Sequence, residues 1–155
     1  MKVLYHYTCK RWLTSIMNDG FLRLTESNLL DMRKPENTTH LEAYNKGDRS
    51  ADAYLYKPVV WLTDKEEPDE YGLGLHSTED KTEIKITVKK MPYFKKWKEW
   101  SKANSINKEW AQALSRGRDT NSWWVSPVRV RLEEIVKIEN RYTGEVYYEN
   151  ATLIR

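Results

Sequence analysis

Residues 83–89 are EIKITVK, an unbroken alternation of polar and branched apolar side chains. Side chains on a β-strand point alternately to its two faces, so this period of two predicts a strand with one buried face. The three apolar residues would point to the core. The polar residues between them, Lys85 and Thr87, would point to solvent or into a cleft. The segment therefore predicts a half-buried strand of a sheet.

The N-terminal segment predicts a strand followed by a short helix. Residues 4–8, LYHYT, are aromatic and hydrophobic enough for a strand, and His6 lies near its C-terminal end. Thr8 is expected to cap the helix, and Gly20 is expected to end it. Apolar residues at helical spacing lie between them: Trp12, Leu13, Ile16 and Met17.

The order of the remaining elements predicts the fold class. Residues 25–56 form a polar stretch that we expect to be mainly loop. Two amphipathic helices are expected between residues 94 and 114, with a break near Asn104 and Ser105 and with tryptophans as core anchors. Further strands are predicted over residues 21–24, 58–63, 123–127, 128–132, 135–139 and 145–148. This order is not a regular βαβ alternation, so we predict one α+β domain spanning residues 1–155.

Composition limits the class of protein. The net charge of the 155 residues is +3, which does not by itself indicate nucleic-acid binding. Cys9 is the only cysteine, so no disulfide can form within the chain, as is typical of a reducing compartment. It is either a buried apolar residue or a nucleophile. No apolar run approaches the roughly 20 residues of a membrane helix. We expect a cytoplasmic protein with no membrane contact and no metal.

Aromatic side chains are abundant, with seven tryptophans and ten tyrosines. Both residue types combine a flat apolar body with a polar tip, which suits a pocket that stacks a planar ligand. The same property suits core packing, so composition alone leaves both interpretations open.

Three segments, in order along the chain, carry a resemblance to a known fold. They are LYHYT at 4–8, VVWLTD at 59–64 and WWVSPVRVRLEEIVKIE at 123–139. They resemble motifs of the ADP-ribosyltransferase-like fold and of small bacterial and phage proteins with HYT, VWLTD and WWVS pieces. The resemblance implies a split antiparallel β-sheet core with flanking short helices. It also implies NAD or a related nucleotide as ligand, and a protein or nucleic acid as acceptor.

The resemblance also implies roles for particular residues. His6 would hydrogen-bond a ribose of the nucleotide, Thr8 the nicotinamide amide, and Trp61 or Tyr7 would stack on the nicotinamide ring. The implied catalytic residues are His6, Trp61 and Glu134. The implied nucleotide-binding residues are His6, Tyr7, Thr8, Trp61, Thr63, Trp123 and Ser126.

The sequence departs from the family pattern at the catalytic acid. The family's glutamate would fall near residues 122–124, where this chain has Ser-Trp-Trp, and Glu133 and Glu134 come about ten residues later. Three functions therefore remain open. The chain is an NAD-dependent transferase, a non-catalytic protein that captures a nucleotide or an NAD-derived signal, or an interaction domain in which the aromatic residues form core and interface.

Overall fold

The computed structural model describes residues 1–25, 27–28, 45–47, 57–68, 80–116 and 118–154. The chain forms two compact units, and each is discontinuous in sequence. The first unit comprises Met1–Leu22, Leu62–Pro92 and Val130–Arg155, and the second comprises Arg23–Trp61 and Tyr93–Arg129. Antiparallel strands and short helices make up both, which confirms the predicted α+β class.

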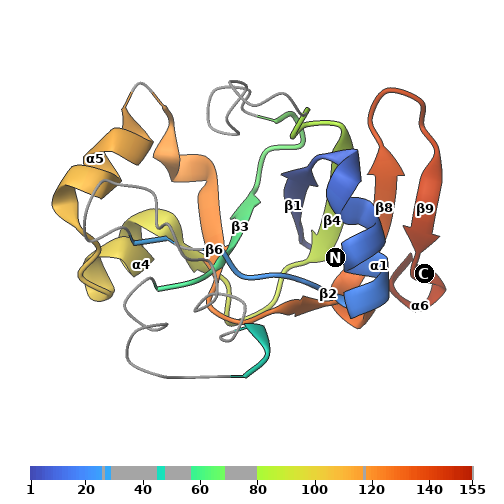
Figure 1. Ribbon diagram of the computed structural model, residues 1–155, viewed down its shortest axis with the longest axis horizontal. Coiled ribbons are helices and arrows are strands. Elements are labelled where there is room, and N and C mark those ends of the chain that lie inside the picture. Colours follow the sequence, from blue (N-terminus) through green and yellow to red (C-terminus); the bar gives the residue numbers. More distant parts are fainter. Residues whose placement is uncertain (26, 29–44, 48–56, 69–79, 117, 155) are drawn as a thin grey trace. The chain divides into compact units, whose positions relative to one another are not determined.

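Pairing of sequence-distant strands builds the first unit. Its strands lie in the order β3-β1-β4-β8-β9, and the part of β3 from Leu62 onward belongs to this unit. β1, β4, β8 and β9 can be followed side by side in Figure 1. The bounds are β1 Val3–Thr8, β3 Val60–Thr63, β4 Ile84–Lys89, β8 Ile135–Asn140 and β9 Val146–Glu149. A short antiparallel pair of β2 (Phe21–Leu22) with β7 (Val130–Arg131) is separate from this sheet.

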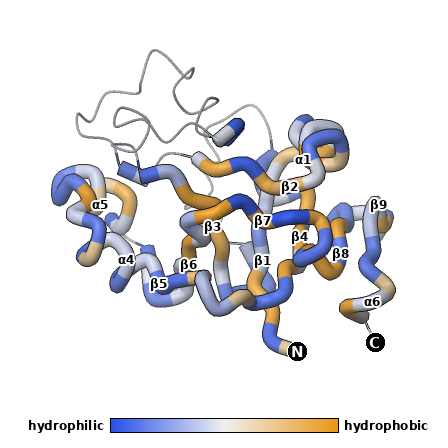
Figure 2. Tube along the Cα trace, turned by 90° about the horizontal axis from the view of Figure 1, so that it is seen from below, coloured by the Kyte–Doolittle hydropathy of each residue, from blue (hydrophilic) through white to orange (hydrophobic). Residues whose placement is uncertain are grey.

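The predicted strand at 83–89 is confirmed as β4, which lies between β1 and β8. Its three apolar side chains, Ile84, Ile86 and Val88, are 0% exposed. Ile86 lies opposite His6 of β1 on one side and Ile138 of β8 on the other. In Figure 2, β4 and β8 both carry the orange colour of hydrophobic residues. Alternation therefore places an aliphatic layer on one face of this sheet.

The segment after β1 differs from the prediction in how its helix begins. A 3₁₀ turn, Lys10–Trp12, comes first, and α1 follows at Leu13–Asp19 with Trp12 in the N-cap position. The prediction of Thr8 as the cap is therefore wrong, because Cys9 is still extended and Thr8 remains the last residue of β1. The predicted end is confirmed: Gly20 is left-handed, with φ of 78°, and its N–H donates to the Ile16 carbonyl.

In the second unit, two helices and a strand pair are built around tryptophans. The strand pair consists of β5, Lys95–Lys96, and β6, Trp123–Ser126. The helices are α4, Trp97–Ala103, and α5, Lys108–Ser115. The predicted break between them is confirmed, and Ser105 there has a φ of 53°. Asn107 begins α5 by accepting a hydrogen bond from the Trp110 N–H at 3.0 Å.

The core of the second unit confirms that the helical tryptophans act as anchors. Trp97 is 3% exposed and Trp100 is 9% exposed, and their rings stack at 6.0 Å. Trp110 packs at the edge and donates its indole N–H to the Ser27 carbonyl at 3.1 Å. Buried aliphatic residues complete the cluster: Val59, Ile106 and Val125.

Three further short elements lie among the described residues. The 3₁₀ turn η2 (Thr120–Ser122) precedes β6, and the 3₁₀ turn η3 (Leu132–Glu134) precedes β8. The helix α6 (Ala151–Ile154) follows β9. The strand predicted over residues 128–132 is present only as β7, because η3 begins at Leu132. Most of the loop predicted over residues 25–56 lies outside the described residues.

Candidate functional site

The two faces of β1 separate residues that are neighbours in the sequence. Successive side chains of a strand point to opposite faces, so His6 and Thr8 share one face and Tyr5 and Tyr7 share the other. The resemblance grouped His6, Tyr7 and Thr8 around one nucleotide. The register of β1 against β4 keeps His6 and Thr8 together and places Tyr7 with the opposite set.

The His6 face combines an apolar floor with two polar side chains. Leu4 is 2% exposed on this face, whereas His6 and Thr8 are half-buried. His6 lies opposite Ile86 and Thr8 lies opposite Ile84, both 0% exposed. The face that is fully closed at Leu4 is therefore partly accessible at the C-terminal end of β1. An imidazole and a hydroxyl there can form hydrogen bonds with a ligand.

Contacts within the fold hold the side chains on the Tyr7 face of β1 in place. The Tyr7 hydroxyl donates a hydrogen bond to the Glu66 carbonyl, and the ring is 5% exposed. Burial raises the pKa of the Tyr7 phenol well above its usual value. Lys85 binds the Glu66 carboxylate at 2.8 Å and lies 5.1 Å from the centre of the Tyr5 ring. The Tyr7 hydroxyl thus has a structural partner inside the fold.

Thr63 lies on the Tyr7 face as well, because it is directly opposite Tyr5 in the β1–β3 pair. Its hydroxyl oxygen accepts a hydrogen bond from the Lys65 N–H at 3.1 Å, which begins the turn after β3. Hydrogen bonding to Lys85 lowers the pKa of the exposed Glu66 carboxyl in the same turn. The sequence pattern did not indicate this Glu66–Lys85 contact, because the two residues lie 19 positions apart.

Glu134 is the last residue of η3 in the first unit and is half-buried. The neighbouring Glu133 is exposed and lies 3.8 Å from Arg131. Within the same unit, η3 is tied down because the Leu132 N–H donates to the Gly20 carbonyl and the Tyr148 hydroxyl donates to the Leu132 carbonyl, both at 3.0 Å. The carboxylate of Glu134 is thus on a short, anchored turn rather than on a strand.

The other predicted site residues, Trp61, Trp123 and Ser126, belong to the second unit. Trp61 packs against Trp97 at 4.7 Å and edge-on against Trp123 at 6.0 Å. Ser126 is 0% exposed, and its hydroxyl donates to the Val128 carbonyl at 2.5 Å. Trp61 and Trp123 thus lie together, and a shared site with His6 stays a prediction.

A polar cluster that the sequence analysis missed lies at the turn that follows β8. Asp80 accepts hydrogen bonds from the hydroxyls of Thr82 and Tyr142, and these bonds lower the pKa of its carboxyl. Arg141 donates to the Thr82 carbonyl at 3.0 Å. The spacing of Asp80 and Thr82 is typical of a local Asx turn, which is the one signal the sequence offers here. The cluster ties the turn to the segment before β4.

Comparison with protein-family models, with curated proteins and with solved structures gives no match to this chain. The resemblance to ADP-ribosyltransferases therefore stays a prediction that depends on the three motifs. Within the described parts of the chain, no helix is long and apolar enough to span a membrane. Those same residues include no group of three or more histidine, cysteine or carboxylate side chains arranged to hold a metal ion.

Proposed function

We propose that this chain binds NAD or another nucleotide of the ADP-ribose type through the face of β1 that carries His6 and Thr8. The proposal depends on one observation: one face of β1 is buried near the start of the strand and partly exposed at its C-terminal end. Leu4 is buried, but the next two side chains on the same face, His6 and Thr8, are polar and partly exposed. They lie directly opposite fully buried isoleucines of β4.

The chemistry of this face suits a nucleoside. A histidine ring can donate to or accept from a ribose hydroxyl, and a threonine hydroxyl can do both toward a carboxamide. Small-molecule sites typically combine an apolar lining with a few polar groups that fix the orientation of the ligand. Ile84 and Ile86 lie opposite Thr8 and His6 as fully buried neighbours, which makes the base of this face apolar. Tyr7 takes no part, because its hydroxyl is used within the fold.

Transfer of ADP-ribose to a protein or nucleic acid is the second part of the proposal. Breaking the nicotinamide–ribose bond leaves an oxocarbenium-like sugar, which a carboxylate stabilises. Residues 122–124 offer no acid, so Glu134 is the residue to which we assign that role. A chain that binds the nucleotide but releases no nicotinamide would instead act by capturing it.

The test measures binding and turnover separately. Calorimetry with NAD and with ADP-ribose should show binding that weakens about tenfold or more in His6→Gln, since a lost hydrogen bond to a bound polar group is worth roughly this factor. Tyr5→Phe is the matched control, because it alters the other face of the same strand. An assay of released nicotinamide, repeated with Glu134→Gln, tests transfer. Equal binding by wild type and His6→Gln, with both proteins folded, would refute the nucleotide site.

A further inference from the structure

A concave surface of the first unit lies at the N-terminal end of β1, whereas His6 and Thr8 lie near its C-terminal end. It is a hollow of about 520 Å³, within the size range of small-molecule pockets. β1 runs from Val3, opposite Lys89, to Thr8, opposite Ile84. Five residues at about 3.3 Å each separate these ends by about 16 Å. The hollow is therefore distinct from the proposed nucleotide site.

One part of the lining of this hollow is apolar. Met1, Met91, Pro92 and Leu153 contribute to its wall. Methionine side chains are flexible and polarisable, so they adapt to apolar groups of varied shape. No aromatic ring is among the described residues that line the hollow, which favours an aliphatic body over a nucleobase as the occupant.

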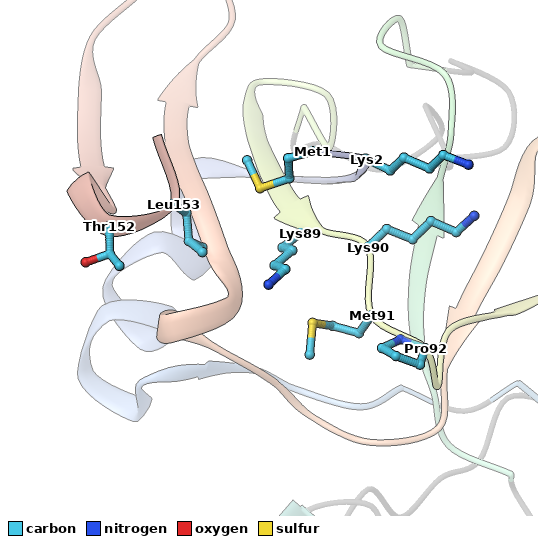
Figure 3. Close-up of a pocket in the computed structure, with 8 residues that line it drawn as sticks. All are labelled: Met1, Lys2, Lys89, Lys90, Met91, Pro92, Thr152 and Leu153. Carbon is cyan, nitrogen blue, oxygen red and sulfur yellow. The ribbon is translucent and has the colours of Figure 1, made fainter. Parts of the chain in front are cut away.

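The charged side chains that line the hollow are cationic among the residues that the structure describes. Lys2, Lys89 and Lys90 line it, and no carboxylate side chain of those described residues does. Figure 3 shows the Lys89 side chain between Met1, Met91 and Leu153, whereas Lys2 and Lys90 extend side by side in another direction. Among the described residues, none of the ion pairs involves Lys89. Lys89 is exposed, and its ammonium group can pair with an anion that approaches the hollow.

Backbone hydrogen bonds hold the walls of the hollow in place. The Lys90 N–H donates to the Lys2 carbonyl at 3.0 Å, which joins the end of β4 to the start of β1. Asn150 fixes the start of α6, because its N–H donates to the Val136 carbonyl at 2.9 Å. Its side chain also donates to the Glu133 carbonyl at 3.2 Å. Less ordering is needed on binding when the site is formed in advance.

We propose that this hollow binds a small amphipathic anion, with its aliphatic body against Met1, Met91 and Leu153 and its carboxylate or phosphate head at Lys89. Both heads present oxygen acceptors to an ammonium donor, so the geometry supports the shared chemistry of the two. Lys2 and Lys90 add positive potential at the rim and raise the local concentration of anions.

Calorimetry with octanoate, octyl phosphate, octanol and inorganic phosphate tests this proposal. We expect the two amphipathic anions to bind more tightly than the neutral alcohol and than phosphate without an alkyl chain. The tighter of the two anions identifies the head group. Lys89→Gln should weaken octanoate binding about tenfold, as expected for the loss of a charged hydrogen bond. Lys81→Gln, which removes an exposed lysine outside the lining, should leave it unchanged.

A spectroscopic readout locates the ligand. With methionine methyl groups labelled with ¹³C, octanoate should shift the Met91 signal and leave that of Met17, which lies on α1, in place. His6→Gln should bind octanoate like the wild type, so this site and the nucleotide site can fail independently. Equal binding of octanol and octanoate, an unchanged Lys89→Gln variant or an unmoved Met91 signal would each overturn the proposal.

Discussion

In the first unit, aliphatic core side chains come from strands that pair along most of their length, whereas the core of the second unit combines indole rings with aliphatic side chains. Ile84, Ile86 and Val88 of β4 are each 0% exposed, and β4 pairs with a strand on either side. In the second unit, Trp61, Trp97 and Trp123 come from three separate segments and pack ring against ring. One core contains an aliphatic layer, and the other contains a cluster of aromatic rings.

This comparison shows which kind of core can be predicted from the pattern of polar and apolar residues in a short segment. Strand alternation has a fixed period, so it identifies the buried residues without knowledge of the partner strand. An aromatic side chain has no such periodic requirement, because its large surface can be buried against any element that reaches it. This is why aromatic content alone is compatible with ligand stacking and with core packing, and why the ring neighbours of Trp61 are seen only in the structure.

The largest expected effect of a substitution is in the aromatic core. Trp97→Ala removes a ring that is 3% exposed and contacts both Trp61 and Trp100. We expect a loss of about 3–5 kcal/mol in the free energy of unfolding, measured by denaturant titration. Tryptophan fluorescence is a suitable probe, because of the seven tryptophans only Trp12 lies in the first unit.

The control for this substitution is Trp12→Ala, which truncates a ring that is 44% exposed. It should lower the free energy of unfolding by less than about 1 kcal/mol, as is usual for surface positions. Similar losses in the two variants would mean that the tryptophan cluster does not stabilise the second unit.

The next effect is in the aliphatic layer. Ile86→Ala should lower the free energy of unfolding by about 2–5 kcal/mol, because it leaves a cavity on the buried face of β4, beside His6 and Ile138. Thr87→Ala, one residue along on the opposite face, is the matched control and should cost less than about 1 kcal/mol. The two values, followed by circular dichroism, compare the two faces directly. A Thr87→Ala loss as large as that of Ile86→Ala would contradict the assignment of the buried face.

The smallest effect depends on pH and comes from Tyr7. Tyr7→Phe removes the hydrogen bond to the Glu66 carbonyl and should cost about 1 kcal/mol at neutral pH. Burial raises the pKa of this phenol above the usual 10.0, so the folded state keeps the proton that the unfolded state loses. The stabilisation from Tyr7 is complete below pH 10 and decreases as the pH rises further.

The gap in unfolding free energy between the wild type and Tyr7→Phe should therefore shrink above pH 10. Denaturant titrations between about pH 8 and pH 11 follow that gap through the ordinary tyrosine range. Tyr5→Phe, measured in the same series, is the matched control, because it removes a phenol hydroxyl from the same face of β1. A gap that widens with pH would show that the phenol ionises more readily in the folded protein.

Local pattern predicted most of the regular elements. The strand at 83–89, the break between the two helices and the left-handed end of α1 at Gly20 are confirmed, because alternation, helical spacing and glycine are signals within a few residues. The cap at Thr8 was wrong, because the sequence does not show how far β1 is extended by its pairing with β4. Applied to residues 4–8, the rule of alternation already separates His6 from Tyr7.

The sequence by itself determined the α+β class and the residues of the aliphatic core, since these depend on short-range periodicity and on the removal of apolar side chains from water. Contacts between residues far apart in the sequence become visible only in the folded chain. Tyr7 donates to Glu66, 59 residues away, and Lys85 binds the same residue, whereas His6 and Thr8 are partly exposed on the other face. Such partners are set by strand register and chain closure, and neither is encoded within a short stretch of sequence.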